Sequence, residues 1–184
     1  MDNGASSYRR FLNGDDNGII EIVHDFKDGL ILYLNGYVRN IHVAEELAED
    51  TFFKLMVKKP KYKKKYAFKT WLYTVGRNVA IDYIRKNSRL LTAPPEDLEA
   101  VLWDEETLEK SYLKEEQRIA LHKALGNLKT EYRQVLYLIY FEDFSNIQAA
   151  QAMKKNRHQI ETLVYRAKKA LREELMKEGQ YERL

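Results

Sequence analysis

Apolar residues recur at intervals of three and four along most of this 184-residue chain, and no segment sustains the apolar–polar alternation of a strand. Intervals of three and four place side chains on one face of an α-helix. Only three prolines and eight glycines interrupt the chain. The pattern therefore predicts an all-α fold. It predicts helices over 17–40, 43–57, 67–89, 115–128, 146–153 and 157–175, with one more starting near Thr130.

Charge is segregated along the chain, although the formal net charge is only +3. Residues 54–69 hold eight lysines and no acid, whereas residues 96–109 hold seven acids and no base. Two prolines at 94 and 95 precede the acidic stretch and cannot continue a helix. We interpret the acidic stretch as a linker between two small helical domains. The expected boundaries are 1–90 for the first domain, 91–112 for the linker and 113–184 for the second domain.

Several classes of protein are disfavoured by what the sequence lacks. It has no cysteine, which excludes disulfides, cysteine zinc sites and thiol catalysis. Its four histidines are scattered, no His-Glu-x-x-His pattern occurs, and no glycine-rich nucleotide loop is present. No run reaches the roughly 18 apolar residues of a membrane span. We expect a soluble, cytoplasmic protein that is not an enzyme and has no catalytic residues, metal site or cofactor.

The second half of the chain carries the start signals of a helix-turn-helix. Ser145 and Asn156 are each followed three residues later by a glutamine, the spacing of a capping box. Residues 146–153 would form the first helix, Lys154–Lys155 the turn and residues 157–175 the second helix. Thr130 is a candidate N-cap for the helix that precedes this motif. A short helix, a turn and a longer polar-faced helix is the arrangement that enters the DNA major groove. The same pattern also fits the end of a helical bundle with a solvated charged face.

The lysine-rich segment of the first half is interleaved with aromatic residues, namely Tyr62, Tyr66, Phe68 and Trp71. Lysines neutralise phosphates, and aromatic rings stack on unpaired bases. This combination favours single-stranded or melting DNA. The alternative is a lysine-rich surface loop whose aromatic residues belong to the core.

Three segments in register resemble the extracytoplasmic-function group of the sigma-70 family. The first, AEELAEDTFFKL (44–55), resembles the family's region 2.2. The second, FKTWLYTVGRNVAIDYIRK (68–86), resembles regions 2.3 and 2.4 and is the most specific match. The third spans 124–171 and resembles region 4. The resemblance runs from about Ile19 to Leu175 and implies a sigma-2 helical bundle, a sigma-4 helix-turn-helix and no catalytic centre.

The resemblance also implies partners and candidate residues. Region 2.2 docks on the clamp helices of the largest subunit of core RNA polymerase, and the matching positions are Glu46, Leu47, Glu49, Asp50 and Phe53. Regions 2.3 and 2.4 recognise and melt the −10 promoter element, with candidates Lys63, Lys64, Lys65, Lys69, Trp71, Thr74, Asn78 and Arg85. Region 4 contacts the flap of the second-largest subunit and reads the −35 element, with candidates Arg157, His158, Gln159, Glu161, Thr162, Tyr165, Arg166 and Lys169. Members of this group are often held by an anti-sigma factor, which is an expected partner here.

The helix-turn-helix departs from the family pattern in its turn and in both of its helices. Ala149 replaces a larger apolar residue, and Leu163 stands where a basic residue is common. Lys154–Lys155 replaces a glycine and an apolar residue in the turn, which predicts either backbone strain or another turn shape. Glu161 stands where a basic residue is common and would repel phosphates. A stand-alone helix-turn-helix regulator is the competing hypothesis. Such a protein would not need the segments 44–55 and 68–86, and it would usually bind a palindrome as a dimer.

Overall fold

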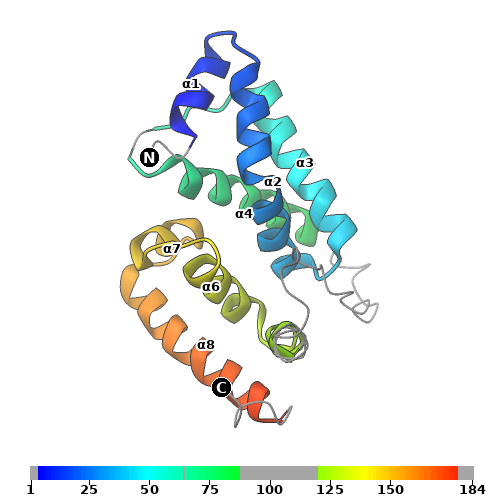
Figure 1. Ribbon diagram of the computed structural model, residues 1–184, viewed down its shortest axis with the longest axis vertical. Helices are drawn as coiled ribbons and strands as arrows, with labels where there is room; N and C mark the ends of the chain where they lie inside the picture. The colour runs from blue at the N-terminus through cyan, green and yellow to red at the C-terminus, as the bar shows by residue number, and fades with distance from the viewer. Residues whose placement is uncertain (1–3, 64, 88–119, 178–184) are drawn as a thin grey trace, which may run out of the picture.

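The computed structural model describes residues 4–63, 65–87 and 120–177, which are helical with short connections and contain no strand. The chain forms two groups of helices (Figure 1). We call the first the N-terminal bundle. It consists of α1 (Ala5–Leu12), α2 (Asn17–Val38), α3 (Ile41–Lys58) and α4 (Phe68–Asn87). We call the second the C-terminal unit. It consists of a helical segment over 120–127 followed by α6 (Thr130–Tyr140), α7 (Asn146–Ala152) and α8 (Arg157–Lys177).

The predicted all-α fold is confirmed, and most helix boundaries agree within two residues. Helix α3 begins at Ile41, two residues earlier than expected, because the Asn40 side chain accepts a hydrogen bond from the Val43 amide (3.1 Å) and caps the helix. Helix α1 was not anticipated. The candidate helix residues 88–89 and 115–119, and the acidic linker, lie outside the described residues.

Helix α2 is the centre of the N-terminal bundle and packs against α1, α3 and α4. Its Ile22, Leu30 and Leu34 are fully buried, as is Leu55 of α3. The three α2 positions lie eight and four residues apart, so they form one stripe of that helix. The bundle therefore holds α3 and α4 on a common core, and this core fixes which faces of the two helices reach solvent.

The C-terminal unit is a helix-turn-helix, as expected. Ser145 forms the predicted capping box with Gln148, and Asn156 makes the equivalent reciprocal pair with Gln159, at 2.8 and 2.9 Å. Helix α8 packs on α6 and α7 through its buried Ile160. The prediction that Thr130 caps α6 is wrong.

Thr130 is instead the first residue of α6, after Lys129, which makes no side-chain cap. The Thr130 hydroxyl accepts a hydrogen bond from Arg133 (3.2 Å), so it is engaged inside the helix rather than ahead of it.

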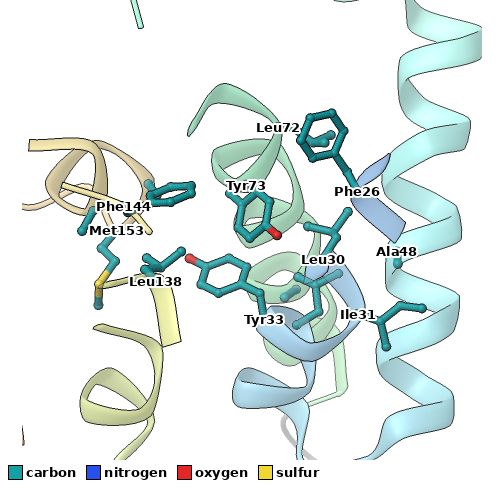
Figure 2. Close-up of a cluster of buried hydrophobic side chains, with 14 of the residues drawn as sticks. Phe26, Leu30, Ile31, Tyr33, Ala48, Leu72, Tyr73, Leu138, Phe144 and Met153 are labelled. Carbon is teal, nitrogen blue, oxygen red and sulfur yellow. The ribbon is translucent and has the colours of Figure 1, made fainter. Parts of the chain in front are cut away.

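The two groups of helices pack directly on each other. Helix α4 contacts α7, and α2 contacts α6. Figure 2 shows this contact, with Tyr33 and Tyr73 of the N-terminal bundle facing Leu138, Phe144 and Met153 of the C-terminal unit. All five side chains are buried. The sequence did not predict that the two groups share one hydrophobic core.

Candidate nucleic-acid interface

Helix α3 presents an acidic face that ends in an apolar patch. Glu46, Glu49 and Asp50 are exposed, and Phe53 is 62% exposed on the same side of the helix. Leu47 is a correction to the predicted set, because it is only 3% exposed and packs in the core. Its side chain is the buried support of this face and cannot contact a partner.

Two residues extend this face that sequence reasoning missed. Met56 and Val57 are 44% and 62% exposed, and they lie one turn beyond Phe53 on α3. Exposed apolar side chains gathered on one helix turn indicate a contact surface rather than a solvated face. The signal was present in the sequence as two apolar residues at the end of an acidic helix. It was not read because those positions also continue the apolar period of the core.

A loop rich in lysine connects α3 to α4 and is anchored at its base. The Tyr8 hydroxyl donates to the Pro60 carbonyl (2.8 Å), and the Tyr62 hydroxyl donates to the Tyr66 carbonyl. Lys63 and Lys65 are exposed on this loop, whereas Lys64 lies outside the described residues. The loop thus exposes the ammonium groups of these two lysines to solvent, while the two hydrogen bonds hold its base in place.

Trp71 sits at the junction of this loop and α4 in a cluster of four aromatic rings. Its ring centroid lies 5.3 Å from that of Tyr8, 5.4 Å from Tyr62 and 5.4 Å from Phe68. Phe68 and Tyr8 are fully buried, but Trp71 is only partly buried. The indole therefore packs on the core, as the second alternative predicts, and keeps an exposed portion, while its role in binding DNA stays a prediction. Tilted rings at these separations hold it rigidly.

The remaining candidates on α4 do not form one open stripe. Arg85 is exposed, and Asn78 is half-buried. The Thr74 hydroxyl donates to the Thr70 carbonyl (2.8 Å), so it is already engaged within the helix. Lys69 turns away from solvent, and its Nζ lies 2.7 Å from a carboxylate oxygen of Glu142 in the C-terminal unit. Lys69 is therefore separated from the exposed lysines of the loop.

Helix α8 carries the predicted reading residues on its solvent side. Arg157, His158, Gln159, Arg166 and Lys169 are exposed, and Tyr165 is 72% exposed. The carbonyl oxygen of the Gln159 side chain accepts from the Asn156 backbone amide (2.9 Å), and this bond fixes the orientation of the side-chain amide. The face is thus basic and polar over more than two turns.

Glu161 and Thr162 are half-buried on the same helix. The Arg157 guanidinium donates to a Glu161 carboxylate oxygen (2.7 Å). The paired Arg157 guanidinium offsets the negative charge of Glu161, which would otherwise repel DNA phosphates. Lys168 lies 5.0 Å from the ring centroid of Tyr140 and is held over the face of that ring.

The turn of the helix-turn-helix keeps a left-handed residue although glycine is missing, so strain rather than another turn shape is the outcome of the two that the sequence left open. Lys154 has φ of 53°, which is in the left-handed region. Its amide donates to the Gln151 carbonyl (3.2 Å), and the next amide, of Lys155, donates to the Ala150 carbonyl (2.8 Å). These two bonds form a Schellman motif, in which glycine is the preferred residue at the left-handed position.

Within residues 4–63, 65–87 and 120–177, no group of three or more His, Asp or Glu side chains is placed to hold a metal ion. None of the helices in this part of the chain is long and apolar enough to cross a bilayer.

Two family profiles match the chain in the order of the two groups of helices. The profile of Sigma-70 region 2 matches residues 22–90. The profile of Sigma-70, region 4 matches residues 118–171. Together they cover about two thirds of the sequence.

Curated relatives and solved structures agree with these profiles. The ECF RNA polymerase sigma factor SigW of Bacillus subtilis is 26% identical over 170 residues, covering 88% of this chain and 91% of its own length. The RNA polymerase sigma factor SigV of the same organism is 25% identical, with 87% and 92% covered.

Among solved structures, the sigma factor RpoE in complex with the anti-sigma factor NepR from Bartonella quintana has a TM-score of 0.69 at 23% identity, covering 85% of this chain and 95% of its own. CnrH in complex with the cytosolic domain of CnrY has a TM-score of 0.64 at 17% identity, with 93% and 95% covered. These two likenesses concern the fold. The two profiles and the curated relatives show that the chain belongs to the sigma-70 family of RNA polymerase sigma factors, in its extracytoplasmic-function group.

Proposed function

We propose that this protein is a promoter-specificity subunit, which binds core RNA polymerase and directs it to promoters by reading a −10 and a −35 element. The observation that carries the proposal is the presence of three distinct surfaces in the family's order along the chain. They are the acidic and apolar face of α3, the lysine and aromatic surface at the start of α4, and the basic face of α8.

The face of α3 is the proposed docking site for the clamp helices of the largest polymerase subunit. Glu46, Glu49 and Asp50 would meet a basic partner, and Phe53 would anchor in an apolar pocket between them. Exposed apolar anchors surrounded by charge are typical of tight, orientation-specific contacts. We add Met56 and Val57 to this surface on the strength of their exposure.

The start of α4 and the preceding loop are the proposed −10 surface. Lys63 and Lys65 are exposed and would neutralise phosphates, and the partly exposed Trp71 would stack on an unpaired base. Base–aromatic stacking is worth about 1–3 kcal/mol per base, which offsets the few kcal/mol needed to extrude a nucleotide. Asn78 and Arg85 would contact the DNA further along α4.

Helix α8 is the proposed −35 reading helix. Its first turn, from Arg157 to Gln159, and the exposed Tyr165 and Arg166 would lie in the major groove, where each base pair displays a distinct set of donors and acceptors. Lys169 would hold a phosphate. The carboxylate of Glu161, already paired with Arg157, would accept from a cytosine amino group.

The first domain would span 1–90 and the second 113–184, joined by the acidic linker. The protein would act in the cytoplasm as a binding subunit with no catalytic centre of its own. An anti-sigma factor would regulate it, since the structurally similar RpoE was solved with the anti-sigma factor NepR.

A binding experiment tests the proposal. Labelled protein is titrated with purified core RNA polymerase, and the complex is then offered a forked DNA with an unpaired −10 strand. The proposal requires saturable polymerase binding, and DNA binding that is far tighter with polymerase than without. Specific binding of the protein to duplex DNA as a dimer, with no affinity for polymerase, would instead identify a stand-alone regulator.

A further inference from the structure

A cavity of about 120 Å³ lies between α2, the segment 120–127 and α6. Most of its wall is apolar and includes Tyr33 of α2, Leu125 of the segment 120–127 and Tyr137 of α6. Figure 2 shows the Tyr33 side chain pointing from α2 toward α6. Phe141, just after α6, also lines the cavity and is 45% exposed, so the cavity reaches solvent beside this side chain.

Two arginines also line the cavity, and their positive charges meet at one backbone oxygen. Arg39, which follows α2, donates to the Gly126 carbonyl (2.6 Å), and Arg133 of α6 donates to the same oxygen (3.1 Å). Arg133 also donates to the Gly36 carbonyl near the end of α2 (3.0 Å). The carbonyls at these helix ends offset part of the positive charge. They also hold the two guanidiniums in fixed positions close to each other.

No carboxylate among the described residues of the wall compensates these two charges. The lining holds both arginines but neither Asp nor Glu. Burial, and then the charge of Arg39, lowers the pKa of Arg133 to about 10. Charges that are taken out of water are stabilised by a counter-ion that also accepts their hydrogen bonds. An anion bound in the cavity would supply both the charge and the acceptors.

Three polar side-chain atoms on the described part of the wall have no hydrogen-bond partner. They are Nε of Arg39, Nε2 of Gln134 and Oδ1 of Asn35. Gln134 is only 3% exposed, so its amide is shielded from bulk water. A buried polar atom without a partner is unfavourable, which favours a ligand that completes the set. The wall thus calls for acceptors opposite two N–H groups and a donor opposite one oxygen.

These requirements define the chemistry of the ligand. A carboxylate supplies the negative charge together with two oxygens, which can accept from Arg39 and Gln134. A hydroxyl on the neighbouring carbon supplies the donor for Asn35, whereas an ammonium at that place would be repelled by both arginines. Ordered water would pair with the polar atoms but would bring no charge. Because a cavity of about 150 Å³ holds one benzene molecule, this smaller and mostly apolar cavity suits a short hydrocarbon group.

We propose that this cavity is a binding site for a small apolar 2-hydroxycarboxylate. Its carboxylate accepts from Arg39 and Gln134, and its hydroxyl donates to Asn35. Its hydrocarbon group lies against Tyr33 and Tyr137. The site goes beyond the proposed function, because none of its lining residues belongs to the proposed polymerase or DNA surfaces.

The first test follows the side-chain amide of Gln134 by NMR in the ¹⁵N-labelled full chain, without DNA or polymerase. The probe is 2-hydroxyisovalerate, which combines a carboxylate, a 2-hydroxyl and an isopropyl group. Millimolar probe should shift the Gln134 amide signal until the site is saturated. Isovalerate lacks only the hydroxyl and should bind about fivefold more weakly. The neutral 2-hydroxyisovaleramide lacks only the charge and should not bind measurably.

A change at Gln134 separates loss of binding from loss of folding. Gln134→Leu replaces a buried amide that has an unpartnered donor with an apolar group of similar size, so the protein should be at least as stable. In a calorimetric titration this variant should bind 2-hydroxyisovalerate about tenfold more weakly than the unmutated protein. Gln151→Leu is the matched control, because it makes the same change on α7 away from the cavity, and it should leave the affinity unchanged.

A second variant fills part of the cavity. Gly36 lies inside α2 and lines the cavity, and a Cβ added there would lie 3.7 Å from Cγ of Gln134, which is an ordinary contact. Alanine is also intrinsically better than glycine within a helix. Gly36→Ala should therefore melt above the unmutated protein, yet bind 2-hydroxyisovalerate about tenfold more weakly because the methyl group takes up volume that the ligand needs.

The outcomes divide cleanly. A saturable shift of the Gln134 amide, with binding weakened in Gln134→Leu and Gly36→Ala and kept in Gln151→Leu, supports the site. An amide signal that does not move with millimolar 2-hydroxyisovalerate overturns it, and so does equal affinity in all three variants. Inorganic phosphate is titrated as a bare anion. If phosphate binds as tightly as 2-hydroxyisovalerate, the apolar wall contributes nothing and the assigned class of ligand is wrong.

Discussion

Lys154 occupies a backbone conformation that only glycine adopts without cost, and replacing it should stabilise the C-terminal unit. Its φ of 53° brings the Cβ of an L-residue too close to the backbone, at a cost of about 1–2 kcal/mol. Glycine removes this strain but loses about 0.5–1 kcal/mol to the greater freedom of the unfolded chain. The two effects leave Lys154→Gly more stable by about 0.5–1 kcal/mol. At 2–4 °C per kcal/mol for a chain of this size, the melting temperature should rise by about 1–4 °C.

The assay is thermal and urea unfolding followed by circular dichroism at 222 nm. Lys154→Ala is the matched control, because it removes the same exposed ammonium and keeps the Cβ that causes the strain. Lys154→Gly should melt above both the unmutated protein and Lys154→Ala. If Lys154→Gly melts at or below Lys154→Ala, the left-handed turn is not strained and the reasoning is refuted.

Three further predictions concern the surfaces and the core. Phe53→Ala should weaken the binding of core polymerase about tenfold in a fluorescence titration, because it removes a central apolar anchor. Ile20→Ala is the control and should have no effect, because it truncates a comparably exposed residue on α2. If Arg166 reads a base, Arg166→Ala should lower the affinity for −35 duplex DNA by about 1–3 kcal/mol. If affinity instead falls equally for all DNA sequences, and the dependence of log affinity on log salt concentration falls by about one, Arg166 holds only a phosphate. Burial raises the pKa values of Tyr8 and Tyr37 to about 12, above the ordinary 10, so the stability that they contribute is fully present below pH 10 and is lost as pH rises toward 12. Urea unfolding at pH 9 and 11.5 checks the last, together with the difference in phenolate absorbance at 295 nm between the unmutated protein and Tyr8→Phe. A phenolate that is missing from the titration of Tyr8→Phe near pH 10, rather than near pH 12, would contradict it.

Local patterns were enough to predict most of the helices and the starts of α7 and α8. The capping boxes at Ser145 and Asn156 depend on residues only three positions apart, so they could be read directly and are confirmed. Strain in the turn at Lys154 also follows from a local rule, the absence of glycine where a helix ends in a left-handed residue. Helix α1 escaped prediction because eight residues carry little more than two turns of periodic signal.

Exposure within a helix face was harder to predict, because periodicity identifies a stripe but not its edges. Leu47 and Phe53 both belong to the α3 segment that resembles region 2.2, yet one is buried and the other is exposed. Which of them reaches solvent depends on how α3 sits on α2 and α4, which is set by packing between distant segments. Met56 and Val57 were missed for the same reason.

The contact between the N-terminal bundle and the C-terminal unit could not be predicted from the sequence. Lys69 was assigned to DNA because it continues the lysine run, and its partner Glu142 lies 73 positions away. No local pattern relates the two. Their pairing requires that α4 pack against α7, and this long-range contact depends on the shapes of both units.

The most direct test of the central claim is run-off transcription with purified core RNA polymerase on a randomised promoter library, with and without this protein. The account predicts protein-dependent transcripts that start at a fixed distance from an enriched two-part motif, and loss of those transcripts in Phe53→Ala. An absence of protein-dependent transcripts from a polymerase that is active with another sigma factor would contradict it.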